Sequence, residues 1–337
     1  MVGRLTPPHK FMISLVEVLM AQIKKIFKMR EIGVLIPLLL LWMVTYIVNH
    51  AFLSSVNLIA LFRSVSITLL GTIGAAFVFS CGMMDVSSGS IYALSGMVTG
   101  LALRDWGLST PIAILIGLSI GLVFGLFNGF IVNKFDLPPF IATLGTQYIA
   151  RGLCNVVTSG KSITGFPDSF KALGSFGPFH IPWSIYISLV FAIVGFLVFK
   201  YSVLGRSLLA VGGNKETARL CGINVRFVSS LSFVISGVFC SLAGILSTAR
   251  LETAQAAAAS GWEMTCIAAA IIGGVSMFGG SVTIAGAIIG ACLMETLNIS
   301  MTMLRVNAFW QKVAIGVVII LAVGIDTYRR NKMAGGK

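Results

Sequence analysis

Ten apolar segments, each close to the length that crosses a lipid bilayer, occupy most of the chain. A bilayer core of about 30 Å takes about 20 apolar residues in a helix. The segments that fit this length are 32–52, 58–80, 88–104, 110–131, 139–158, 181–200, 227–249, 263–278, 283–304 and 309–326. Hydrophobic residues make up 57% of the chain and charged residues only 10%, against about 25% charged in a typical soluble domain. The sequence therefore predicts an all-α integral membrane protein and excludes a soluble enzyme.

The basic residues between these segments predict their orientation, because Lys and Arg near span ends stay on the cytoplasmic side. Ten spans place both termini on one side, and that side carries sixteen of the 24 Lys and Arg residues while the other carries five. We therefore expect both termini in the cytoplasm. Four tryptophans fall at the expected outer ends of spans, where an indole prefers the interface: Trp106, Trp183, Trp262 and Trp310.

The expected domains follow from these spans. Residues 1–31 form a cytoplasmic tail, in which residues 11–27 are apolar but interrupted by charges, as is typical of a helix lying on the membrane surface. Residues 32–326 form the transmembrane domain, with a cytoplasmic loop at 201–226, and residues 327–337 form a second cytoplasmic tail. Six cysteines are scattered singly, so neither a disulfide framework nor a metal site is predicted.

Glycines on the fourth segment recur every four residues and share one helical face. Such a face lets another helix backbone approach closely, so we predict a packing seam made of Gly117, Gly121, Gly125 and Gly129. Segments two to five and seven to ten also match with an offset of five. Because five is odd, the two halves have opposite orientations, and the sequence predicts an inverted five-span repeat.

Matching interruptions before the third and eighth segments mark a candidate transport route, because broken helices in both halves of a repeat point to a path near the midplane. The candidate path residues are Asp85, Ser87, Ser88, Gly89, Ser90, Thr143, Ser260 and Gly261. Asp85 has an alternative role as a cap of the third helix. Glu295 is the acid deepest in a span, and we expect it to point outward or to bond a neighbour such as Asn298.

The sequence contains no clustered nucleophile, base or metal ligands of the kind that a membrane enzyme needs. Gly160-Lys161-Ser162 resembles the end of a phosphate-binding loop, but position 155 is Asn where that loop has Gly. We therefore expect no catalysis and no cofactor in this chain.

The polar stretch from Lys200 to Arg226 is too long and too basic for a simple turn. Asn214 can cap a short helix from Lys215 to about Cys221, and Gly222 can end it in a left-handed conformation. Such a helix is either a docking element for another protein or a simple surface helix.

Four regions of the chain resemble the ribose-type sugar permeases, the membrane subunits of bacterial ATP-binding-cassette (ABC) importers. They are Gly82-Met83-Met84-Asp85-Val86-Ser87-Ser88-Gly89-Ser90; Leu137-Pro138-Pro139-Phe140-Ile141-Ala142-Thr143-Leu144-Gly145-Thr146; Leu204-Gly205-Arg206-Ser207 with Ala210-Val211-Gly212-Gly213-Asn214 and Cys221-Gly222-Ile223-Asn224-Val225; and Ala249-Arg250-Leu251 with Ile271-Ile272-Gly273-Gly274 and Gly279-Gly280. The resemblance runs in order over about residues 32–326.

This resemblance implies a type II ABC importer fold in a bacterial inner membrane, with a second permease subunit, two cytoplasmic ATPase subunits that bind ATP and magnesium, and an external sugar-binding protein. It assigns ATPase coupling to Gly205, Arg206, Gly212, Gly213, Asn214, Lys215, Glu216, Ala218, Arg219 and Gly222. The expected substrate is a ribose-like or allose-like monosaccharide. The alternatives are a gradient-driven transporter or channel, or a permease for a sugar acid, a polyol, a furanosyl signal molecule or a branched-chain amino acid.

Overall fold

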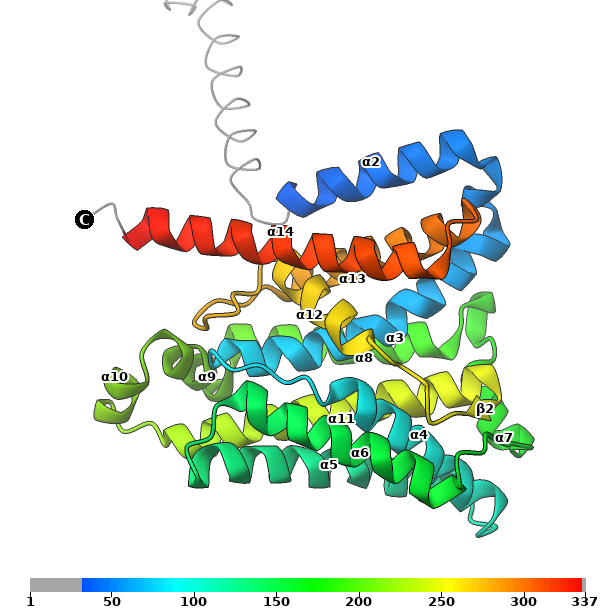
Figure 1. Cartoon of the computed structure of the whole chain (residues 1–337), viewed down its shortest axis with the longest axis horizontal. Helices are drawn as coiled ribbons and strands as arrows, with labels where there is room; N and C mark the ends of the chain where they lie inside the picture. The colour runs from blue at the N-terminus through cyan, green and yellow to red at the C-terminus, as the bar shows by residue number, and fades with distance from the viewer. Residues whose placement is uncertain (1–31, 335–337) are drawn as a thin grey trace, which may run out of the picture.

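The computed structural model describes residues 32–334, in which helices lie mostly side by side (Figure 1). The α-helices are α2 (Ile32–Val48), α3 (Ser55–Ser80), α4 (Ser88–Arg104), α5 (Thr110–Lys134), α6 (Pro139–Thr158), α7 (Asp168–Lys171), α8 (Trp183–Tyr201), α9 (Val203–Gly213), α10 (Lys215–Leu220), α11 (Val225–Leu251), α12 (Trp262–Ile272), α13 (Ile284–Met303) and α14 (Ala308–Ala334). Short 3-10 helices lie at His50–Leu53, Ala172–Gly174 and Pro178–His180, and β1 (Ile163–Thr164) pairs antiparallel with β2 (Thr253–Ala254). The predicted surface helix at 11–27 lies outside the described residues.

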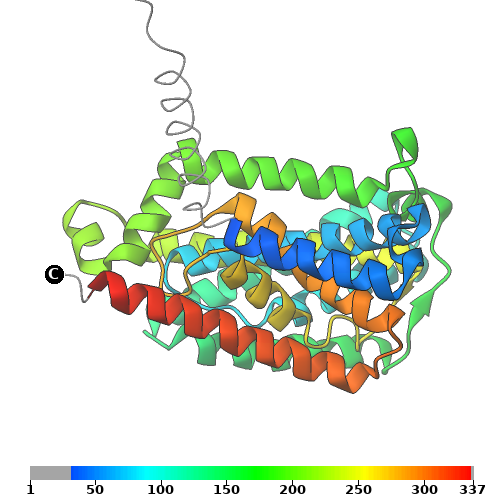
Figure 2. The same cartoon turned by 90° about the horizontal axis from the view of Figure 1, so that it is seen from above.

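Each of the ten apolar segments of the sequence falls on a helix. By length and composition, α3, α5, α8, α11 and α13 can cross a membrane, and several other apolar helices are shorter. The helices α9 and α10 lie at one end of the molecule, whereas α7 and β2 lie at the other (Figure 1). Figure 2 shows α8, in light green, and α14, in red, on opposite edges.

Side-chain caps fix where several helices begin. The Asn214 side chain accepts a hydrogen bond from the Thr217 amide at 2.9 Å, and Ser202 accepts one from Gly205 at 2.9 Å. Such a bond satisfies an amide that has no partner inside the helix. The short helix expected from Lys215 is therefore present as α10, and Gly222 follows it with a left-handed φ of +82°.

The core is formed by α11, which packs against α3, α4 and α5. The four glycines of α5 face this helix. A Cβ at Gly121 would collide with the backbone of Gly237, and one at Gly125 would collide with the backbone at Phe233. The absence of side chains at these positions lets the two backbones approach each other, which is the arrangement that the four-residue glycine period predicts.

The eighth apolar segment does not form one continuous span. Its helix, α12, has 11 residues, which at about 1.5 Å per residue is about 16 Å, roughly half of a bilayer core. The backbone leaves the helix at Gly273 and continues through Gly274, Gly279 and Gly280, which all have positive φ. The predicted end at 278 is therefore wrong, because this glycine-rich stretch ends the helix at Ile272 and forms a loop.

Trp262 also differs from its predicted place. Its indole Nε1 donates to Thr68 Oγ1 at 3.2 Å, and its ring packs against Tyr92 in a tilted arrangement with centroids 4.8 Å apart. Thr68 lies half-way along α3, so the indole is packed in the interior and not at an outer interface. The residue begins a half-length helix, which the simple span count does not anticipate.

Helical structure extends into two stretches that the sequence prediction places outside the spans. The stretch at 201–226 is mostly helical, because α9 precedes α10 and buries Gly205, Leu208 and Val211 against the rest of the protein. The C-terminal helix α14 continues to Ala334, beyond the tail boundary expected at 326. The residues 335–337 lie outside the described part.

Candidate functional site

Two helices begin next to each other inside the helix bundle. Gly89, in the first turn of α4, lies against the carbonyl of Ala259 and the carboxylate of Glu263, in the first turn of α12. The N-termini of both helices thus meet beside the middle of α3, where Trp262 bonds Thr68. A helix N-terminus carries a partial positive charge, so two such ends converge on one place.

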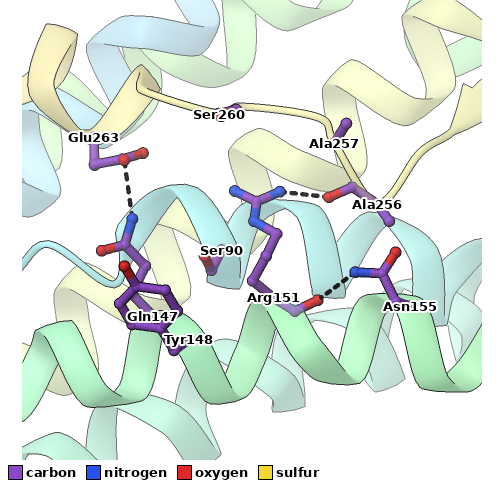
Figure 3. Close-up of a pocket in the computed structure, with 9 residues that line it drawn as sticks. All are labelled: Ser90, Gln147, Tyr148, Arg151, Asn155, Ala256, Ala257, Ser260 and Glu263. Carbon is purple, nitrogen blue, oxygen red and sulfur yellow. Dashed lines mark hydrogen bonds between the residues drawn. The ribbon is translucent and has the colours of Figure 1, made fainter. Parts of the chain in front are cut away.

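A cavity of about 380 Å³ opens at this meeting point (Figure 3). Its lining comes from α4, α6, the segment before α12, and α12 itself: Ser90, Gln147, Tyr148, Arg151, Asn155, Ala256, Ala257, Ser260 and Glu263. Its volume is at the lower end of the range of about 300 to 1,000 Å³ that holds small molecules. The arrangement is a cavity with a largely polar lining inside the helix bundle.

Gln147 and Glu263 join the two sides of the cavity. Gln147 Nε2 donates to Glu263 Oε1 at 3.0 Å, and the dashed line in Figure 3 marks this bond. The other carboxylate oxygen of Glu263 is buried and has no hydrogen-bond partner among the described residues, and the same is true of Ser90 Oγ. A buried polar atom without a partner costs about 1–3 kcal/mol, so a hydroxyl group or a water molecule that reached these two atoms would be bound favourably.

Arg151 holds the segment that closes the cavity. Its Nη1 donates to the carbonyl of Ala256 at 2.5 Å (Figure 3) and to that of Ala258 at 2.7 Å. This segment, residues 255–261, is not helical. Irregular backbone at membrane depth is tolerated only where protein buries it or where it lines a water-filled cavity. The segment is thus anchored by α6 and supplies backbone to the cavity wall.

A second polar cluster lies just before α4 and is closed to solvent. Asp85 Oδ1 accepts from Ser87 Oγ at 2.6 Å, and Asp85 Oδ2 accepts from Ser236 Oγ at 3.1 Å. Asn128 Nδ2 donates to Ser87 Oγ at 3.0 Å, and Thr146 Oγ1 donates to Asn128 Oδ1 at 2.6 Å. This chain of hydrogen bonds ties α5, α6 and α11 to the segment that starts α4.

The predicted path residues therefore divide between two places. Ser90 and Ser260 line the cavity, Gly89 lies behind Glu263, and Gly261 starts α12 with φ +85°. Asp85, Ser87 and Thr143 are buried near the closed cluster, where Thr143 Oγ1 accepts from the amide of Val86 at 3.2 Å, and Ser88 is buried beside them. Asp85 does not cap α4 directly, because Ser87 is the cap residue and Asp85 bonds it.

Sequence reasoning missed Gln147, Arg151 and Glu263 as cavity residues. Each is a polar residue in or beside an apolar segment, which is the signal that marks intramembrane sites. Glu295, the acid singled out instead, does not reach Asn298. Its Oε1 accepts from Thr68 Oγ1 at 2.6 Å, so the residue belongs to the interior packing between α13 and α3.

The residues expected to couple to another subunit gather on α9 and α10. Gly205 and Ala218 are buried, Gly212 is half-buried, and the rest of the set is exposed: Arg206, Gly213, Asn214, Lys215, Glu216, Arg219 and Gly222. Leu220 at the tip is 87% exposed. A Cβ at Gly212 would collide with the Ser80 carbonyl and the Gly280 amide, so α9 touches the end of α3 and the loop after α12.

Comparison with known proteins decides the family. Residues 57–323 match the model described as "Branched-chain amino acid transport system / permease component". The chain belongs to this permease family. It is accordingly a transport subunit of a membrane importer and not an enzyme.

Several curated relatives of this permease are similar over most of their length. The D-allose transport system permease protein AlsC of Escherichia coli K12 is 39% identical over 276 residues, which are 82% of this chain and 84% of AlsC. The ribose import permease protein RbsC of Bacillus subtilis is 37% identical over 88% of this chain and 93% of its own. The autoinducer 2 import system permease protein LsrC of Enterobacter sp. strain 638 is 33% identical over 90% of this chain and 88% of LsrC. No solved structure matches the permease.

Proposed function

We propose that this permease forms the membrane path of an ATP-driven importer for a ribose-like or allose-like monosaccharide. The observation that carries the proposal is the similarity to AlsC and RbsC over more than four-fifths of the chain, together with a polar cavity at the convergence of α4, α6 and α12. ATP binds to a separate subunit in this proposal, and a second permease and an external binding protein complete the importer. LsrC, an autoinducer 2 import permease, is also similar to this chain at 33% identity. A furanosyl signal molecule is therefore the alternative ligand.

The topology of the proposal has ten spans in an inverted repeat. Its support is that corresponding helices of the two halves pack in the same way. In the first half α4 packs on α5 and α6, and in the second half α12 packs on α13 and α14. Across the halves, α3 packs on α12 and α11 packs on α4. The C-terminal end of α14 lies at the same end of the molecule as α10 in both views (Figures 1 and 2). Both termini and α10 are then cytoplasmic, and a fluorescent protein that folds only in the cytoplasm should be bright when fused after Lys337.

The direct test is reconstitution. The permease, its ATPase and its binding protein in proteoliposomes should take up labelled D-ribose or D-allose only when ATP is present inside with the ATPase. A gradient-driven transporter would instead take up the sugar without ATPase when an ion gradient is imposed. Uptake under that second condition, with no ATP, would reject the importer assignment.

In the proposal α10 docks the ATPase. Its support is an apolar side chain, Leu220, that is 87% exposed at the tip of a polar hairpin, beside the Glu216–Arg219 ion pair at 3.3 Å. The double substitution Glu216→Arg and Gly222→Arg should leave the permease in the membrane but lose ATPase during co-purification. The matched control is Lys161→Glu, an exposed charge reversal at the opposite end of the molecule. Equal retention of the ATPase by the two variants would reject α10 as the docking element.

A further inference from the structure

Two polar side chains of the cavity lining are buried, and each carries an atom without a hydrogen-bond partner in the described structure. Glu263 is 5% exposed and Ser90 is fully buried, yet Glu263 Oε2 and Ser90 Oγ make no hydrogen bond within the described structure. They come from the first turns of α12 and α4, which meet at the cavity (Figure 3). A carboxylate oxygen accepts hydrogen bonds, and a serine hydroxyl both donates and accepts. The pair is matched to a ligand hydroxyl group.

Three features near Glu263 favour its carboxylate form, against the cost of burying a charge. Gln147 donates to its other oxygen at 3.0 Å, Arg151 lines the same cavity, and Glu263 lies in the first turn of α12, where the helix dipole favours an anion. Gly89 leaves the space for the carboxylate, because a Cβ there would collide with Oε2. The site is thus built to hold a carboxylate with one oxygen free.

A free carboxylate oxygen selects by charge. It accepts a hydrogen bond from a neutral hydroxyl group, but a carboxylate or phosphate on the ligand would bring a like charge into a low-dielectric cavity, where repulsion is strong. Arg151 keeps its positive charge, but its Nη1 donates to the carbonyls of Ala256 and Ala258, so the exclusion applies to the ligand group that reaches Glu263 and Ser90. Selection against a competitor by an unfavourable charge is a common route to specificity.

We infer that Glu263 and Ser90 are specificity-determining residues inside the permease, which bond hydroxyl groups of a neutral polyhydroxylated solute and exclude its anionic derivatives. This inference rests on the proposed function as a sugar permease and adds a filter within the membrane to whatever selection occurs outside. Among the ligand classes that the sequence leaves open, it favours neutral sugars and polyols over sugar acids.

The test measures access to the cavity, and it needs no ATP hydrolysis. A cysteine replaces the exposed cavity residue Ala257, in a background where the exposed Cys221 is serine, and the permease–ATPase complex is held in lipid nanodiscs. The probes are D-ribose and D-allose against D-ribonate and D-allonate, which carry a carboxylate on the same carbon skeleton. With a dissociation constant of about 10 mM, about 100 mM sugar should slow thiol labelling about tenfold.

The expected result is that a neutral sugar slows labelling and the matching acid does not. Glu263→Gln should let the acid slow labelling as well, because the amide removes the negative charge and adds a donor, and Ser90→Ala should weaken protection by the neutral sugar. Glu252→Gln is the matched control: this residue is exposed and lies outside the cavity lining, so its pattern should equal that of the parent.

Three outcomes would overturn the inference: equal protection by sugar and acid in the parent, an unchanged pattern in Glu263→Gln, or no protection by either neutral sugar. These outcomes do not depend on ATP-driven uptake, so the importer assignment stands or falls separately in the reconstitution experiment. If the permease imports a sugar with ATP but fails this test, residues other than Glu263 and Ser90, or another subunit, select the substrate.

Discussion

Gly121 of α5 and Gly237 of α11 face each other so closely that a Cβ on either residue would collide with the carbonyl oxygen of the other. No side chain can enter between the two helices at this point. Because α11 also packs on α3 and α4, this backbone contact positions the helix that supplies Ser236 to the closed polar cluster.

The substitution Gly121→Ala should lower the melting temperature of the purified permease. The added methyl group meets backbone atoms that cannot rotate away, and overpacking of this kind typically costs about 1–3 kcal/mol. Gly145→Ala is the matched control in α6, since nothing lies within 4 Å of its Cβ and alanine favours a helix over glycine. If both variants melt at the temperature of the parent, the seam is looser than described.

The sequence was sufficient for features that depend on neighbours along the chain. The cap at Asn214 and the stop at Gly222 are local signals, and α10 has the expected bounds to within one residue. The helix α9 has local signals of the same kind, since Ser202 caps it and its apolar residues Leu208 and Val211 have helical spacing. The basic residues of this stretch favour a loop instead, and this helix is therefore not predicted from the sequence.

The cavity could not be predicted from such local signals. Its polar residues come from α4, α6 and α12, which are far apart in the sequence, and only the folded structure brings Gln147 to Glu263. A hydropathy count also assumes that each apolar segment crosses the membrane as one helix. The half-length helix at Trp262 breaks that assumption, and the cavity exists because of the break.

Asn128 should contribute more to stability than other asparagines of the membrane domain. Its side chain joins Ser87 Oγ at 3.0 Å and Thr146 Oγ1 at 2.6 Å, and both partners are buried. Asn128→Ala removes one hydrogen bond from each hydroxyl group, although Ser87 Oγ still bonds Asp85 and Thr146 Oγ1 still bonds the Ala142 carbonyl. Each buried hydrogen bond contributes about 0.5–1.5 kcal/mol, so thermal unfolding should occur at a lower temperature. The comparison is Asn155→Ala, whose exposed side chain bonds only the Arg151 carbonyl of its own helix. Equal melting temperatures would contradict a structural role for the buried cluster.

Gly212 should transmit movement between α9 and the rest of the protein. It touches the Ser80 carbonyl and the Gly280 amide, and the loop that contains Gly280 follows α12, which carries Glu263. Gly212→Ala pushes these backbones apart, so we expect fewer sugar molecules imported per ATP hydrolysed in the reconstituted importer. The adjacent Gly213→Ala is a close control, because Gly213 is exposed and its Cβ would meet nothing within 4 Å. Similar coupling ratios for the two variants would show that this contact does not transmit movement.

The permease alone should bind sugar weakly. Glu263 Oε2 and Ser90 Oγ are the buried atoms of the cavity lining without a partner among the described residues, and the polar groups of Tyr148, Asn155 and Ser260 are exposed, so water competes for them. Each sugar hydroxyl group that loses water without a new partner costs about 1–3 kcal/mol. Trp262, a natural stacking platform, is instead packed against Tyr92.

Calorimetry of the purified permease with D-ribose and D-allose should therefore give a dissociation constant in the millimolar range, about −4 kcal/mol. The Glu263→Gln variant is measured alongside, to separate the cavity from surface binding. Weak binding suits an importer in which a separate external protein captures the sugar and ATP supplies the direction, because a tight site inside the membrane would slow release. A micromolar constant, about −8 kcal/mol, without the external protein would contradict this prediction and favour a gradient-driven transporter, which must capture its substrate unaided.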